Sequence, residues 1–375
     1  MPSTSSRTWV TIFILSALGV FALKILLAYS TRGAPDISAW EDFLANIQNC
    51  GVCVYQTGGV MVEPWGTRVT PFNHPPFVIH FLRIVGGISA ALKLDFGFVF
   101  RALTSCFDLG SAVLVYKLLT RSGLFTPVRF LLYLLAPVTI IISGFHGQTD
   151  TLMIFFVLLA VFLIDRPLLA GLAFGTALSI KIVPLIVAVA FIFYLPKAQR
   201  IRFVAAAIVI GCLLALPYIA QAPTMIAKQV LGYGSFPGRW GWSRLLFAWI
   251  GPSNLFWSTT RISAYLLLAY IWYLSFKMNR KGIPIYTQLT AAFFVLMSFT
   301  PSWGTNYMSW LDPFAVTAGA LPALAYYLTS GAFLAVLYFV NPDESTRLSG
   351  LCWLAVLLLT WKLLRHVSTY KNSEP

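Results

Sequence analysis

The feature that most constrains this chain is a series of apolar runs of about 20 residues, separated by short clusters of basic residues. Of its 375 residues, 58% are hydrophobic, which is more than a single water-soluble core can bury. Runs of this length can cross a lipid bilayer as α-helices. The sequence therefore predicts an all-α polytopic membrane protein whose surroundings include membrane lipids.

The basic residues orient the predicted helices in the membrane. A net charge of +14 could indicate a nucleic-acid partner, but the basic residues lie in short clusters between apolar runs, as the positive-inside rule describes for cytoplasmic loops. The clusters are Lys117, Arg121 and Arg129; Lys197, Arg200 and Arg202; and Lys277, Arg280 and Lys281. We therefore expect no nucleic-acid partner, and a cytoplasmic N-terminus that carries Arg7.

These loops divide the chain into roughly 11 or 12 transmembrane helices, within one domain of residues 1–375 and without a separate soluble domain. The predicted spans are 9–29, 98–119, 130–144, 151–164, 168–180, 183–195, 203–219, 255–276, 285–299 and 351–364, and residues 310–340 form either one long helix or a hairpin. A long first extracytoplasmic loop covers 31–97, and a second covers 221–252. Within the first, residues 76–94 predict a helix on the outer membrane surface.

The acidic residues gather on one predicted side of the membrane. The chain has only 12 Asp and Glu residues, and seven of them fall on the outer side: Asp36, Glu41, Asp42, Glu63, Asp95, Asp150 and Asp312. Ionisable groups close to a bilayer are costly unless function retains them. This distribution indicates an integral, multi-pass membrane enzyme with its reaction centre on the extracytoplasmic face.

Asp36 follows the first predicted span directly. The apolar residues after it have helical spacing: Ile37, Trp40, Phe43, Leu44 and Ile47. They predict an amphipathic surface helix that starts at Asp36. Asp36 could serve chemistry there, or it could only cap the helix, while Glu41 and Asp42 are expected to be solvated. Asp108, inside a predicted span, is expected to form a hydrogen bond with a neighbouring helix.

The five cysteines divide into two groups. Cys106, Cys212 and Cys352 lie in apolar spans and are expected to be small core residues. Cys50 and Cys53 lie in the first outer loop, where an oxidising compartment could join them as a disulfide. Free thiols are the favoured state of this pair, and the spacing offers no second ligand pair for zinc.

Four segments, in this order, resemble a known superfamily. The first is the pattern of Asp36, Trp40, Phe43, Gly51 and Tyr55, followed by Asn73–Phe77; the others are Phe145–Asp150, then Ala170–Ala173 with Ser179–Pro184, and Thr305–Phe314. Over residues 8–315 the chain is similar to GT-C glycosyltransferases that use polyprenyl-phosphate sugars. The similarity is greatest to the bacterial polyprenyl-phosphate-mannose mannosyltransferase and dolichyl-phosphate-glucose glucosyltransferase branches.

The resemblance implies a GT-C-like helical bundle and a hexosyltransferase activity. Its partners would be a polyprenyl-phosphate sugar donor and a lipid-linked or glycan acceptor, with mannose as the first candidate sugar and glucose the second. The resemblance places the general base on Asp36, and attack opposite the phosphate would invert the anomeric centre. Because no Asp-x-Asp follows the first helix, as it does in metal-dependent members, we expect no metal and no cofactor.

Further polar and aromatic residues are candidates for substrate binding. They are His74, His146, Gln148, Asp150, Lys181, Arg239, Arg244, Tyr307 and Trp310. A departing phosphate needs cations, and Lys181 is the strongest candidate because it lies at a helix end before Pro184. His146 and Asp150 have i, i+4 spacing, which would place them on one helix face. Tyr307 and Trp310 are expected to line the cavity.

Each of these residues also has a structural interpretation. Lys181 could be a lysine that extends to the interface, the aromatic residues near Arg239 could belong to the interfacial belt, and both histidines could form structural hydrogen bonds. Two other functions also stay open. A lipid-sugar flippase or transporter would have a similar number of spans, but usually paired halves and interrupted helices. A non-catalytic scaffold subunit would function without Asp36.

Overall fold

The computed structural model describes residues 4–63, 66–232, 235–340 and 342–370, with side chains at all of these except 4–7, 63, 66, 342–344 and 346. The predicted outer acid Glu63 therefore has its side chain outside the described part, as does Arg7. The chain divides into two compact units. The first comprises residues 1–114, 139–184 and 201–233, and the second comprises 115–138, 185–200 and 234–375.

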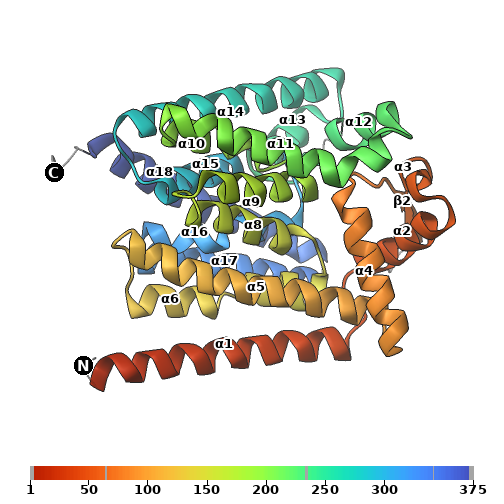
Figure 1. The fold of residues 1–375 in the computed structure, drawn as a ribbon, viewed down its shortest axis with the longest axis horizontal. Helices are drawn as coiled ribbons and strands as arrows, with labels where there is room; N and C mark the ends of the chain where they lie inside the picture. The colour runs from red at the N-terminus through yellow and green to blue at the C-terminus, as the bar shows by residue number, and fades with distance from the viewer. Residues whose placement is uncertain (1–3, 64–65, 233–234, 341, 371–375) are drawn as a thin grey trace. The chain divides into compact units, whose positions relative to one another are not determined.

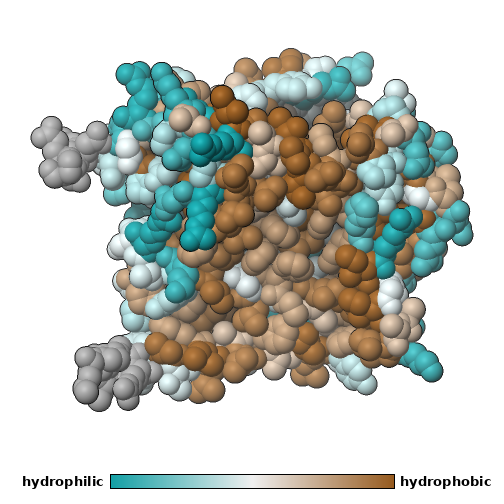
Figure 2. All heavy atoms as spheres, viewed as in Figure 1, coloured by the Kyte–Doolittle hydropathy of each residue, from teal (hydrophilic) through white to brown (hydrophobic). Residues whose placement is uncertain are grey.

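The prediction of an all-α polytopic membrane fold is confirmed. Within the described residues, six helical segments are long and apolar enough to cross a membrane: Thr8–Ser30, Phe96–Arg121, Pro127–His146, Lys197–Ile219, Ala320–Phe339 and Arg347–Thr369. Five shorter apolar helices accompany them: Phe77–Leu92, Asp150–Phe162, Pro167–Ile180, Leu185–Tyr194 and Ile285–Phe299. Apolar side chains cover large parts of the face shown in Figure 2, as expected for a surface that meets lipid.

Besides the elements of the predicted first outer loop, the first unit contains helices of different lengths between residues 4 and 231. They are α1 (Thr4–Ser30), most of α5 (Phe96–Arg121), the π-helix η2 (Ile140–His146), α8 (Asp150–Phe162), α9 (Pro167–Ile180), most of α11 (Lys197–Ile219) and α12 (Pro223–Leu231). α1 packs against η2, and α8 packs against α9.

Two glycines let α9 and α11 approach closely. A Cβ on Gly171 would lie 2.3 Å from the Phe203 carbonyl oxygen, and one on Gly175 would lie 2.4 Å from that of Ala207. Small residues at helix crossings are typical of membrane bundles. Gly171 belongs to one of the segments that carried the resemblance, and here it has a packing role.

The predicted first outer loop forms a compact group of short elements. They are α2 (Asp36–Cys50), η1 (Gly51–Cys53), α3 (Val54–Thr57), the antiparallel hairpin of β1 (Gly59–Glu63) and β2 (Gly66–Thr70), and α4 (Phe77–Leu92). In Figure 1, α2, α3, β2 and α4 lie together in red and orange. The amphipathic helix is confirmed, because its five predicted apolar residues are all buried. The hairpin was not predicted.

The second unit holds helices of the C-terminal part of the chain together with three shorter helices from earlier in the sequence. They are α6 (Pro127–Leu134), α7 (Pro137–Thr139), α10 (Leu185–Tyr194), α13 (Gly241–Ile250), α14 (Asn254–Arg280), α15 (Ile285–Phe299), α17 (Ala320–Phe339) and α18 (Pro342–Thr369). α17 packs against α18, and α15 packs against α14 and α18. β3 (Phe236–Pro237) pairs with β4 (Ser302–Trp303).

Two predicted spans have a different form in the structure. The predicted span 130–144 is divided into α6, α7 and η2, with Pro137 opening α7. Residues 310–340 are neither one helix nor a hairpin. They contain the end of the 3-10 helix η3 (Thr305–Trp310), the short α16 (Asp312–Ala315) and η4 (Val316–Ala318), and then α17.

Several cysteine predictions are wrong. Cys50 and Cys53 form a disulfide, with their Cα atoms 5.6 Å apart, although free thiols were the favoured state. Cys352 is buried as expected, but Cys106 and Cys212 are exposed on their helices. Small apolar side chains are tolerated on a lipid-facing surface, so location in a span did not imply burial.

Candidate active site

The segment before α8 gives the candidate site its shape. The π-helix η2 ends at His146, and Gly147 follows with φ 76°, a left-handed conformation that favours glycine. α8 then starts at Asp150. The chain therefore turns between His146 and Asp150, and the prediction that these two residues share one helix face is wrong. π-Helices occur frequently at functional sites.

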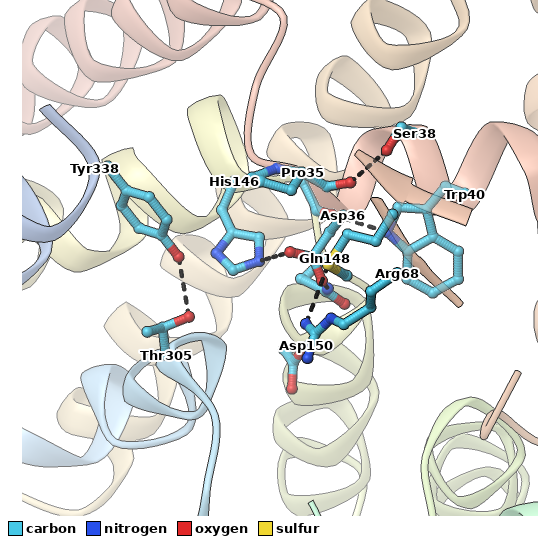
Figure 3. Close-up of polar contacts among 12 residues, drawn as sticks. Pro35, Asp36, Ser38, Trp40, Arg68, His146, Gln148, Asp150, Thr305 and Tyr338 are labelled. Carbon is cyan, nitrogen blue, oxygen red and sulfur yellow. Dashed lines mark hydrogen bonds and ion pairs between the residues drawn. The ribbon is translucent and has the colours of Figure 1, made fainter. Parts of the chain in front are cut away.

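Asp36 is the first residue of α2, five residues after Thr31, the residue that follows α1, and its carboxylate contacts the last residue of η2 and the segment after it. Gln148 Nε2 donates a hydrogen bond to Asp36 Oδ1 at 2.5 Å. His146 Nε2 lies 3.1 Å from Asp36 Oδ2. Figure 3 shows both side chains pointing toward the carboxylate. Pro35, not Asp36, is the N-cap of α2, and no side chain caps the helix. The alternative that Asp36 only caps this helix is therefore wrong.

The Asp36 carboxylate is ionised and accessible. Burial alone would raise its pKa, but the adjacent His146 and the Gln148 amide together lower the pKa below the usual value of 3.8. Its side chain remains 27% exposed, whereas that of His146 is 4% exposed. A second molecule can therefore reach the carboxylate while its two partners stay fixed.

Asp150 and Lys181 form a separate ion pair in the same unit. α9 ends at Ile180, so the prediction that Lys181 lies at a helix end is confirmed, and Lys181 has an extended backbone. Lys181 Nζ donates to both oxygens of Asp150, each at 2.8 Å. The Asp150 side chain is fully buried and that of Lys181 is 14% exposed. The cation is thus held at the protein interior with one edge accessible.

His74 is buried close to these charged residues. Burial, and next the positive charge of Lys181, lower the pKa of His74 to about 3, although Asp150, the Ile180 backbone and Asp36 act in the opposite direction. The ring centroid lies 4.9 Å from that of Trp40. Tyr55 donates a hydrogen bond to the His74 carbonyl at 2.8 Å. His74 is therefore a neutral imidazole that can donate from one ring nitrogen and accept at the other.

A second ion pair, between two membrane-spanning helices, also lies next to η2. Lys24 of α1 pairs with Asp108 of α5, and the Ser143 hydroxyl lies 3.5 Å from the same carboxylate. The predicted contact between Asp108 and a neighbouring helix is confirmed. Lys24 was missed because a single lysine in an apolar run gives little signal without its partner. A Cβ on Gly144 would lie 2.9 Å from Lys24 Cα, so α1 packs directly on η2 there.

The second unit contains the other candidate residues. Arg239 is exposed in the loop after β3, and Arg244 donates to Ser349 Oγ at 2.9 Å. Tyr307 stacks on Trp310 with ring centroids 3.9 Å apart, and its hydroxyl donates to Ser235 Oγ at 3.0 Å. The pairing of β3 with β4 brings the segment before Arg239 beside that before Tyr307.

Trp310 does not offer a cavity wall of its own. It is 2% exposed, so Tyr307, which covers it, has the accessible aromatic surface. Asp312, expected among the outer acids, is also buried, at 1% exposure. The expectation that Trp310 lines an open cavity is therefore corrected.

Arg68 is a polar residue near the candidate site that the sequence did not single out. It lies on β2 opposite Met61, donates to its sulfur at 3.2 Å, and is drawn with the Asp36 group in Figure 3. The sequence analysis did not single out Arg68, because the hairpin that brings it near Asp36 was not predicted. Among the described residues, no group of three His, Cys, Asp or Glu side chains is arranged to hold a metal ion.

Comparison with known proteins identifies the fold. No protein-family model matches the chain, and no curated protein matches its sequence. In structure the chain is similar to ArnT from Cupriavidus metallidurans bound to undecaprenyl phosphate, with TM-score 0.53 and 13% identity over 97% of this chain and 78% of that chain. The apo state of the same protein gives TM-score 0.53 and 14% identity over 98% and 78%. The chain therefore has an ArnT-like, GT-C-type helical membrane fold.

Proposed function

We propose that the chain is a membrane glycosyltransferase that transfers a hexose, with mannose as first candidate, from a polyprenyl-phosphate-linked donor to a lipid-linked or glycan acceptor. The fold supports this proposal, because a structure of similar fold was determined with undecaprenyl phosphate bound. The one-sided acids support a reaction on the extracytoplasmic face. The observation that carries the proposal is the carboxylate of Asp36, ionised, accessible and held by two side chains.

Asp36 is the proposed general base. Its carboxylate would accept the proton of the acceptor hydroxyl as the hydroxyl oxygen attacks the anomeric carbon. Gln148 and His146 each engage one oxygen, which fixes the carboxylate orientation while leaving lone pairs for the substrate. Attack from the face opposite the phosphate forms the new glycosidic bond with inverted configuration, and the carbon–oxygen bond to the phosphate breaks.

The departing lipid phosphate requires positive charge and hydrogen-bond donors. Lys181 is the proposed partner in the first unit, because its ammonium group is held in place by Asp150 and remains partly exposed. A phosphate oxygen would share this cation with the Asp150 carboxylate. Neutral His74 would offer a hydrogen bond to the donor. Arg239, Arg244 and Tyr307 of the second unit stay proposed substrate contacts, and the transfer is expected to need no metal.

The proposed function can be tested by following labelled sugar from synthetic polyprenyl-phosphate mannose or glucose into a membrane lipid extract. We compare the purified chain with Asp36→Asn and with Asp42→Asn, each with and without a chelator. Asp42 is a matched control, because it lies on the same helix and accepts a hydrogen bond from the Val60 amide at 2.9 Å. Transfer by the parent and the Asp42 variant, lost only in Asp36→Asn and unchanged by chelator, is the expected result.

Other outcomes have defined meanings. Equal transfer by all three proteins would remove Asp36 as the base. Transfer that stops with the chelator would assign a metal-dependent reaction. No transfer from either donor, together with movement of lipid-linked sugar across vesicle membranes, would favour the flippase alternative, whereas neither activity would favour a scaffold subunit.

A further inference from the structure

A buried arginine on α5 contacts both segments of the candidate site, the one that leads from α1 to Asp36 and the one that carries His146 and Gly147. Arg101 lies on α5 and is completely buried. Burying a guanidinium is costly unless its donors are satisfied. Its four hydrogen bonds all go to uncharged oxygens of the surrounding backbone and one hydroxyl. A residue kept at this cost within a membrane span requires a physical explanation.

Three of these hydrogen bonds hold the end of α1 and the residue that follows it, Thr31. Arg101 Nη2 donates to the carbonyl oxygens of Ala28 at 2.9 Å and Thr31 at 2.8 Å, and Nη1 donates to Thr31 Oγ1 at 2.9 Å. The fourth, from Nε to the Gly97 carbonyl at 2.9 Å, fixes the guanidinium to its own helix. The chain leaves α1 at this point and reaches Asp36 five residues after Thr31. The arginine therefore determines where the Asp36 segment begins.

The stem of the same side chain packs against the segment that carries His146. A Cβ on Gly147 would lie 3.0 Å from Arg101 Cγ and 2.5 Å from Ile37 Cδ1. A Cβ on Gly33 would lie 2.8 Å from the Phe145 carbonyl oxygen and 3.1 Å from Arg101 Nη1. Both segments are thus at contact distance around one side chain, and each has a glycine where a larger residue would separate them.

Trp40 ties the same two segments from the other end. Its Nε1 donates to the Gly147 carbonyl at 3.1 Å, and its ring stacks on Phe100, the neighbour of Arg101. Asp36 lies between the Arg101 contacts and Trp40 in the sequence, about one helical turn before Trp40 on α2. We propose that Arg101 is a positioning residue that, by binding the end of α1 and packing on Gly147, fixes Asp36 against His146. This inference rests on the proposed function.

Only an arginine makes all of these contacts. A lysine ammonium could reach some of the α1 oxygens, but it lacks the planar fork that serves Ala28, Thr31 and Gly97 together. Methionine keeps the apolar stem and removes every donor. Thr31→Val removes one acceptor with little change of shape. This series weakens the proposed link in steps, so the inference does not depend on the folding of any one variant.

The first measurement is independent of activity. Hydrogen exchange of the parent, Arg101→Met, Arg101→Lys and Thr31→Val in lipid nanodiscs reports local opening of each segment. We expect exchange at residues 31–37 and 145–149 to increase about tenfold in Arg101→Met and less in the other two variants. Arg202→Met, an exposed arginine of the same unit, is the control. Increased exchange in only one segment, or equally throughout the unit, overturns the proposal.

The second measurement separates positioning from general destabilisation. In Arg101→Met the turnover number should fall about 100-fold with little change in KM, because a small displacement of a reacting group is costly. The acid limb of its pH–rate profile should move up by about one pH unit, because Asp36 loses the influence of His146 while it remains partly buried. Arg101→Lys should recover part of both effects. Lower rates at every pH with an unmoved acid limb overturn the proposal.

The two proposals can fail separately. If the parent transfers no sugar from either donor, the proposed function fails, and hydrogen exchange alone decides whether Arg101 fixes the Asp36 and His146 segments. If the parent is active and exchange in the Arg101 variants equals that of Arg202→Met, the proposed function stands and the role of Arg101 is wrong.

Discussion

Asp36 and Asp108 both contact η2, yet they occupy opposite kinds of environment. Asp108 is paired with Lys24, and the two side chains are 8% and 6% exposed. Asp36 is paired with a histidine and an amide, and its side chain is 27% exposed. Two residues of η2 contact these carboxylates: Ser143 contacts Asp108, and His146, three residues later, contacts Asp36. Lys24 and burial close off the Asp108 carboxylate, whereas the exposed edge of the Asp36 carboxylate leaves it able to accept a proton.

The largest expected effect is the loss of activity when Asp36 is changed. Asp36→Asn should lower the transfer rate about 1,000-fold, as removal of a general base does, with little change in thermal stability. The matched change Asp108→Asn should lower the thermal stability and affect the rate only through the amount of folded protein. Initial rates and melting temperatures of both variants check this. An Asp36→Asn variant that stays active would show that Asp36, like Asp108, has no catalytic role.

The ion pair should show a strong dependence on both partners. Lys24→Met leaves a buried carboxylate without its cation and should destabilise the chain by about 3 to 5 kcal/mol. The double variant Lys24→Met with Asp108→Leu removes both charges and should regain most of that stability. Unfolding in a denaturing detergent series measures the difference. A double variant no more stable than the single one would show that the charges contribute a role beyond mutual compensation.

A third prediction concerns the turn that carries His146. Gly147→Ala should cost about 1 to 3 kcal/mol in stability and lower activity further, because the backbone is left-handed and the added Cβ meets Ile37 and Arg101. Gly123→Ala separates the two causes. Gly123 also has a positive φ, 65°, but open space within 4 Å of its Cβ position. Equal loss of activity in both variants would leave no role for contacts around Gly147.

The smallest effect is a shift in pH dependence. Because the pKa of Asp36 is lowered below 3.8, its carboxylate should stay ionised until the pH falls past the lowered value. The stability that its contacts contribute should be complete above the usual pKa and be lost as the pH falls from there through the lowered pKa. His146→Gln removes the main lowering influence while burial remains, so the acid limb of activity should move up by about one pH unit. His80→Gln, on α4, is the control. An unmoved limb would mean that His146 does not influence the titrating group.

The sequence predicted those parts of the fold that depend on composition and period. Apolar runs identified α1 and α5 within a few residues, and helical spacing identified the buried face of α2. The hairpin of β1 and β2 was missed, because two five-residue strands inside a long loop bury little surface and have no strong alternation. The break at Pro137 was missed because the apolar run continues through it.

The sequence identified most residues of the candidate site, but it did not predict which of them contact one another. Asp36, His146, Gln148, Asp150 and Lys181 were all singled out, but the sequence paired His146 with Asp150 by helical spacing. The structure pairs His146 with Asp36 and Asp150 with Lys181 instead. A left-handed glycine between His146 and Asp150 cancels the helical spacing, and contacts more than 100 residues apart, such as that of Gln148 with Asp36, leave no local pattern.

The Lys24–Asp108 pair also has a consequence for membrane insertion. The two residues are 84 positions apart, so α1 is synthesised well before its partner helix. An unpaired lysine at the centre of a span costs about 2.5 to 3.5 kcal/mol during insertion by the translocon. Lys24 lies six residues before the end of α1, near enough for its long side chain to extend toward the interface in the meantime. α1 should therefore settle at its final depth only once α5 has entered the bilayer.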